Sequence, residues 1–133
     1  MCLDYVVAKR KKVFRDYLKG ATKAGYVICY GCADGVRVGK KKRYYAAFQW
    51  ETEYKKGWNG AGEQFATHTN GDCKRYKPYF HRFILLEDAR RWPSISNVVL
   101  KWKVNIKDIS TVGYQNRFPV IVAKRLYLIG EVK

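Results

Sequence analysis

The segment 97–105, NVVLKWKVN, alternates apolar and basic side chains, and this period of two constrains the fold more than any other stretch. Four apolar residues at every second position from Val98 to Val104 fall on one side of an extended chain. Val99, Lys101 and Lys103 fall on the other side. Antiparallel sheets that bury one face show this alternation. The segment therefore predicts a strand of a mainly antiparallel sheet.

Other patterns fill in the rest of an α+β domain that covers residues 1–133. Apolar steps of three and four over 3–19 predict an N-terminal amphipathic helix that ends at Gly20. EDARRW predicts a short helix near 86–92, stopped by Pro93. Residues 55–76 are rich in Gly, Asn and Thr and predict a long loop, with a short strand at 64–69. The remaining predicted strands cover 25–32, 36–39 after an ADG turn, 43–54, 77–86, 108–115 and, beyond an Asn116–Arg117 junction, 118–129.

The charge of the chain points to a polyanionic partner. Lys and Arg number 27 against 11 acidic residues, which gives a net charge of +16. Repulsion among so many like charges lowers the stability of the folded chain. A charge of this size is therefore better explained by binding to nucleic acid or a nucleoprotein complex than by solubility alone. The cations are spread along the chain rather than gathered on one helix, which argues against a membrane surface. With no secretory signal and no apolar run of ~20 residues, a cytoplasmic location is expected.

Three segments mix cations with aromatic residues, at 40–45, 54–60 and 74–83. Proteins that bind single strands use this mixture, since cations follow the phosphates and rings stack on bases. The alternative is that the rings belong to the core and the cations to its rim. The candidate phosphate contacts are Lys40, Lys41, Lys42, Arg43, Lys55, Lys56, Lys74, Arg75 and Lys77, and the candidate stacking residues are Tyr45 and Trp58.

The aromatic block 44–50 does not form one stacking platform, because alternate residues of a strand face opposite ways. Tyr44, Phe48 and Trp50 share one side and are expected in the core. Tyr45 lies on the other side, so it is the ring of this block that is expected to meet a ligand.

The four cysteines raise the question of a metal. Cys29 and Cys32 form a Cys-x-x-Cys pair, and His68 and Cys73, or alternatively His81, would complete a Cys/His set of the kind that holds structural zinc. The two thiols differ by an odd step on a strand, however, so they share a side only where the chain turns. The alternative is that no cofactor is present and the cysteines pack as small hydrophobic residues.

Catalytic motifs are scarce. The chain has two histidines and contains no nucleophile elbow, phosphate-binding loop or metalloprotease helix. Glu51 and Glu53 share one strand side, as the metal-binding carboxylates of a nuclease would, although nearby cations make an ordinary charge ladder the simpler interpretation. We therefore expect a binding protein rather than an enzyme.

Residues 79–129 carry the sequences YFHRFILLEDARRW, VVLKWKVNIKDISTVGYQ and PVIVAKRLYLI. This pattern resembles small phage-encoded accessory proteins of unknown function, in which an aromatic-His-x-Phe strand precedes an EDA helix. The resemblance implies a role in host takeover or counter-defence. The corresponding alternative is an inhibitor, anti-CRISPR-like, that docks on a host defence protein or nucleoprotein complex.

A second resemblance is to ADP-ribosyltransferases. Tyr30-Gly31 is similar to their Tyr-x-Gly-type strand, and Tyr79-Phe80 to the aromatic strand before a helix. A catalytic Glu at a matching position is missing, because Glu131 stands almost at the end of the sequence.

Overall fold

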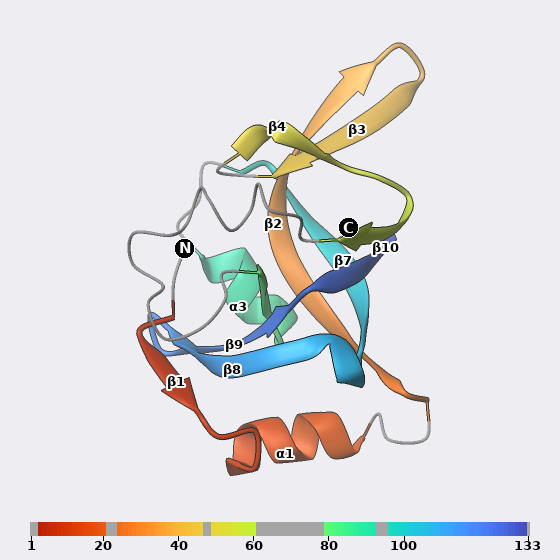
Figure 1. The fold of residues 1–133 in the computed structure, drawn as a ribbon. Coiled ribbons are helices and arrows are strands. Elements are labelled where there is room, and N and C mark those ends of the chain that lie inside the picture. The colour runs from red at the N-terminus through yellow and green to blue at the C-terminus, as the bar shows by residue number, and fades with distance from the viewer. Residues whose placement is uncertain (1–2, 21–23, 47–48, 61–78, 93–95, 133) are drawn as a thin grey trace.

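A computed structural model describes residues 3–20, 24–46, 49–60, 79–92 and 96–132, with only the backbone for 49–52. It shows an antiparallel sheet that curls around the core, with two helices packed on it (Figure 1). The α+β prediction is thus confirmed. The elements are β1 (Tyr5–Val7), α1 (Lys12–Lys19), β2 (Tyr26–Val38), β3 (Lys41–Ala46), β4 (Gln49–Tyr54), β5 (Gly57–Gly60), β6 (Phe80–Phe83), α3 (Leu86–Arg91), β7 (Val98–Asn105), the 3-10 turn η1 (Ile106–Asp108), β8 (Ile109–Gln115), β9 (Phe118–Ala123) and β10 (Arg125–Glu131).

The described strands follow the order β1-β8-β9-β6-β2-β7-β10-β5, with β3 paired to the far half of β2 and β4 paired to β3. All pairings are antiparallel. Strand β2 is long enough to serve two partners, since Tyr26–Ala33 pair with β7 and Ala33–Val38 pair with β3. Its second half and β3 form a hairpin that projects beyond the rest of the sheet (Figure 1).

The prediction of a turn at ADG was wrong, because β2 continues through it. Gly35 lies just beyond the last residue of β2 that pairs with β7. At this position the Asn97 side chain supplies the hydrogen bonds that a neighbouring strand would make. The Asn97 side-chain oxygen accepts from Gly35 N at 2.8 Å, and its nitrogen donates to Gly35 O at 3.0 Å. The chain turns instead at Gly39, where φ is +67°.

The predicted helix over 3–19 was also wrong in its first half, where the chain forms β1. Val6 and Val7 fit a helical face, but they pair with Gly113 and Val112 of β8. A side chain at Gly113 would meet the Tyr5 carbonyl oxygen, so this glycine permits the close approach of β1. The helix begins only at Lys12, and its Phe14 is fully buried against Tyr114.

Three further predictions put element breaks in the wrong places. Residues 43–54 form two paired strands, β3 and β4, rather than one. Residues 118–129 likewise divide into β9 and β10, at Lys124. The predicted loop over 55–76 contains β5, while its predicted strand at 64–69 lies outside the described residues.

The predicted junction at Asn116–Arg117 is confirmed. Both residues have positive φ, 49° and 71°, which is the geometry of a two-residue type I′ hairpin turn. Its twist matches that of the flanking strands. This local signal therefore fixes the register of β8 against β9.

The alternation in β7 is confirmed as well. Leu100, Trp102 and Val104 are fully buried, while Lys101 and Lys103 are half-buried on the other side. The inner face of the curled sheet joins these residues to Cys29 of β2 and to residues of β6, β8, β9 and β10 in one hydrophobic cluster. A smaller cluster lies on the outer face beneath α3, around Phe83, Ala89 and Val120.

The charged side chain of Arg82 lies inside the core. Arg82 of β6 is 7% exposed, and its guanidinium lies 4.8 Å from the Trp102 ring centre, 5.4 Å from that of Tyr54 and 5.3 Å from that of Phe80. It donates to the Tyr54 hydroxyl at 3.0 Å. Across from it stands Gly31, where an added Cβ would lie 2.5 Å from Arg82 Cδ.

We therefore predict that Gly31→Ala destabilises the fold. The new methyl group would overlap a buried side chain whose ring contacts hold it in place, so the free energy of unfolding should fall by about 1–3 kcal/mol. Urea unfolding of the variant measures this change. Gly60→Ala is the matched control, because nothing lies within 4 Å of a Cβ at Gly60. Equal stability of the two variants would show that Arg82 yields easily.

His81 is a second ionisable group of β6, and its side chain is half-buried. Burial lowers its pKa from 6.5 to about 4, and Nδ1 donates to the Tyr79 carbonyl oxygen at 2.9 Å. The neutral ring is therefore the form that fits the fold. The unfolded chain takes up this proton near pH 6.5, whereas the folded chain does so only near pH 4.

Stability should accordingly fall as pH drops from about 6.5 toward 4, by up to about 1.4 kcal/mol per pH unit from this group. His81→Asn should flatten that slope. Urea unfolding at several pH values compares the variant with the parent protein. An unchanged slope would mean that other groups cause the acid sensitivity.

Candidate nucleic-acid interface

Part of the outer face of the sheet is not covered by α3. We call this part the open face. Its residues come from four neighbouring strands, and their pairing sets them side by side: Tyr127 of β10 is opposite both Trp58 of β5 and Lys103 of β7, and Lys103 is opposite Ile28 of β2. The open face consists of Tyr26, Ile28, Trp58, Lys101, Lys103, Arg125, Tyr127 and Ile129.

Five of these residues, two cations and three rings, form a continuous series of contacts, which we call the cation–aromatic ladder. The Arg125 guanidinium lies 4.7 Å from the Trp58 ring centre. Trp58 meets Tyr127 edge to face, with 5.3 Å between ring centres. Lys103 Nζ then lies between two rings, 4.6 Å from the centre of Tyr127 and 5.0 Å from that of Tyr26.

The ladder is accessible and positively charged. Trp58 and Tyr26 are each 39% exposed, far more than the rings of the core. In the described part of the chain, no cation of the ladder forms an ion pair with an acid, whereas Arg15, Lys42 and Arg43 each lie within 4 Å of one. Arg125 and Lys103 thus keep their charge available to an anion beside exposed rings.

A short turn positions Trp58. The Asn59 side chain makes two hydrogen bonds with the backbone of Lys55. Its oxygen accepts from the Lys55 N–H at 2.9 Å, and its nitrogen donates to the Lys55 carbonyl oxygen at 2.9 Å. Gly57 takes φ of +83°, which suits glycine and closes the turn. The predicted residues Lys55, Lys56 and Trp58 are therefore brought together, and both lysines are exposed. Trp58 lies on a strand rather than in the predicted loop.

The predicted residues of the segment 40–45 lie elsewhere, on the projecting hairpin. At ~3.3 Å per residue, the ten residues from Ile28 to Val38 place the hairpin tip about 30 Å along β2 from the ladder. Lys40 and Lys41 are exposed near that tip. Tyr45, half-buried, pairs with Asp34 on β2.

Two cations of the hairpin already have acidic partners. Lys42 Nζ lies 3.0 and 3.1 Å from the two carboxylate oxygens of Glu131, and the Tyr44 hydroxyl donates to the same carboxylate at 2.9 Å. Arg43 is 3.8 Å from Glu53. Lys42 therefore ties the hairpin to the end of β10, and the more available charges are those of Lys40 and Lys41.

The remaining predicted contacts, Lys74, Arg75 and Lys77, lie outside the described residues, as do the proposed metal ligands His68 and Cys73. Cys29 and Cys32 lie on a continuous stretch of β2 and face opposite ways. Cys29 is buried in the core, whereas the Cys32 thiol donates to the Ala89 carbonyl of α3 at 3.3 Å. As placed, they do not form the Cys-x-x-Cys corner of a zinc site. Among the described residues, no cluster of three or more potential metal ligands occurs.

The enzyme alternatives rest on the Tyr30-Gly31 pair, for an ADP-ribosyltransferase, and on Glu51 and Glu53, for a nuclease. Gly31 is buried beneath Arg82, so a ligand has no access to the Tyr30-Gly31 pair from that side. Glu53 is paired with Arg43, and the side chain of Glu51 lies outside the described part of the structure.

Sequence reasoning did not select Tyr26, Lys103, Arg125 or Tyr127 as site residues. A signal was present, because Arg125 and Tyr127 alternate with the buried Leu126 and Leu128 as Lys103 alternates with its neighbours in β7. The missing information was the pairing of β10 with β5 and β7, which brings residues far apart in sequence into one row.

Comparison of the chain with family models, curated proteins and solved structures found no match. Of the helices in the described ranges, none has the length and apolar character needed to cross a membrane.

Proposed function

We propose that this protein binds nucleic acid through the open face. The cation–aromatic ladder is the observation that carries the proposal. Exposed rings offer surfaces on which bases stack, and Arg125 and Lys103 lie beside them for the phosphates. The net charge of +16 adds long-range attraction for any polyanion.

The arrangement favours contacts with the backbone and with base faces over reading of base edges. Stacking tolerates every base, because each has a flat π surface. Phosphate contacts likewise carry no direct sequence information. The proposed activity is therefore binding with weak sequence preference and a strong dependence on salt.

The stacking role predicts the effect of Trp58→Ala. Loss of this ring should weaken binding of a single-stranded oligonucleotide about tenfold, because one stacked base contributes ~1–3 kcal/mol. Fluorescence anisotropy measures Kd across a salt series. Tyr5→Ala is the matched control, because Tyr5 is 70% exposed on β1, at the other edge of the sheet. Equal losses in the two variants would place the contact away from the ladder.

The parent protein provides the first test of the whole proposal. Affinity should fall steeply as salt rises, since each neutralised phosphate releases counterions. Absence of binding to both DNA and RNA at about 50 mM salt, where electrostatic attraction is strong, would rule the proposal out.

The hairpin offers a second contact with the same backbone. Lys41→Gln should lower the salt slope by roughly one, because an exposed charge is lost. Lys42→Gln should change the slope less, because this lysine is held by Glu131, and should instead cost up to about 1 kcal/mol of stability. The salt series and urea unfolding separate the two effects. A larger slope change for Lys42 than for Lys41 would contradict this assignment.

A second candidate is docking on a host protein, as an inhibitor does. The observation in its favour is that Val36 and Val38 are 47% and 51% exposed on the projecting, basic hairpin. An acidic partner with an apolar groove would match both properties. Capture from host lysate that survives nuclease treatment, and that Val36→Ser weakens, would support this candidate over nucleic acid.

A further inference from the structure

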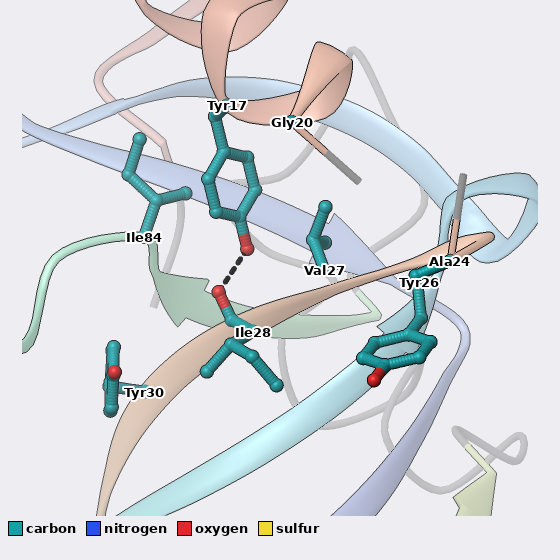
Figure 2. A pocket seen from close by; sticks show the side chains of 8 residues that line it. All are labelled: Tyr17, Gly20, Ala24, Tyr26, Val27, Ile28, Tyr30 and Ile84. Atoms are coloured by element: carbon teal, nitrogen blue, oxygen red, sulfur yellow. Dashed lines mark hydrogen bonds between the residues drawn. The ribbon is translucent and has the colours of Figure 1, made fainter. Parts of the chain in front are cut away.

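A hollow of about 410 Å³ lies at one end of the open face, between α1 and the start of β2 (Figure 2). This volume falls within the range of roughly 300–1,000 Å³ that is common for small-molecule sites. Tyr17 points into it from the helix, and residues near the start of β2 line it from the sheet. The lining consists of Tyr17, Gly20, Ala24, Tyr26, Val27, Ile28, Tyr30 and Ile84.

The walls of the hollow suit a flat, apolar-faced ring. Tyr26 and Tyr30 stand two positions to either side of Ile28, about 13 Å apart along the strand. The Tyr17 hydroxyl donates to the Ile28 carbonyl oxygen, which fixes the helix over the sheet. In the described part of the chain, the hydroxyls of Tyr26 and Tyr30 have no hydrogen-bond partner, so they are available to a ligand.

The hollow is continuous with the ladder. Tyr26 belongs to both, since its ring lines the hollow and also lies 5.0 Å from Lys103 Nζ. Strand pairing sets Lys103 opposite Ile28 and Lys101 opposite Tyr30. Two cations therefore stand along the side of the hollow that faces the ladder, where the phosphates on either side of an inserted ring would lie.

We infer that the hollow binds one unpaired nucleobase of a single strand whose neighbouring bases stack on the ladder. This inference rests on the proposed function and narrows it. A base inside a duplex is paired and stacked, so it reaches such a hollow only after unpairing, at a cost of a few kcal/mol. The protein should therefore prefer single strands to duplexes.

The test removes one base at a time. A single-stranded oligonucleotide of about 12 nucleotides covers the ladder and the hollow, and a set of otherwise identical probes carries one abasic position each. An abasic site should weaken binding roughly tenfold at each position that stacks on the ladder. The abasic site that leaves the hollow empty should weaken binding more than this, because a base enclosed by the hollow loses more contact area. The same sequence as a duplex should bind more weakly than the single strand.

Blocking the hollow identifies it as the source of the effect. Ala24→Trp places a large ring at the rim from an exposed position, and Ala8→Trp is the matched control at an exposed position before α1. Ala24→Trp should remove the single most sensitive position, while Ala8→Trp should keep it. Thermal unfolding confirms that both variants are folded.

The possible outcomes test the proposed function and the inference about the hollow separately. Absence of binding by the parent protein overturns both the proposed function and this inference. Binding with a flat abasic profile, or a most sensitive position that survives in Ala24→Trp, overturns the inference alone and leaves binding through the ladder intact. A duplex bound as tightly as the single strand also overturns the inference.

Discussion

The buried guanidinium of Arg82 is the constraint around which the curled sheet closes. It contacts rings from three strands, Tyr54 of β4, Phe80 of β6 and Trp102 of β7, and it passes over Gly31 of β2. Taking a charge out of water costs several kcal/mol. Contacts with desolvated ring faces contribute about 2 kcal/mol each, and donation to the Tyr54 hydroxyl and the His81 carbonyl oxygen offsets more of this cost.

Cation–ring contacts occur both in the core and on the surface of this protein, but the cations differ in their access to solvent. Arg82 faces inward and is enclosed by rings, whereas Arg125 and Lys103 face outward and lie beside rings that remain accessible. The period of two along β7 and β10 makes this possible, because one strand supplies both an apolar inner side and a basic outer side. The proposed binding surface is thus built from the same strands that form the core.

Local patterns in the sequence predicted the parts of the fold that depend on neighbours in the chain. The alternation of β7, the short helix α3 and the turn at Asn116–Arg117 are of this kind. Parts that depend on distant pairing were missed. Val6 and Val7 join β8 although their spacing fits a helix, and Asn97 extends β2 through a segment that resembles a turn.

The candidate site shows the same division. Trp58, Lys55 and Lys56 were selected because they are close together in sequence. Arg125, Tyr127 and Lys103 join them through strand register alone, which a single sequence does not reveal. The sequence predicts Lys42 as a phosphate contact because it lies in a basic run. It gives no sign that Glu131, 89 residues later, pairs with this lysine.

The length of β2 has a consequence for any ligand that reaches both basic regions. Because one unbroken strand runs from the ladder to the hairpin tip, it holds the two basic regions at a fixed separation. A flexible ligand long enough to cover that separation gains avidity, since its second contact forms within the same complex. A shorter ligand engages one region only and gains none. If the proposed binding holds, affinity should therefore increase with ligand length once the ligand covers both regions.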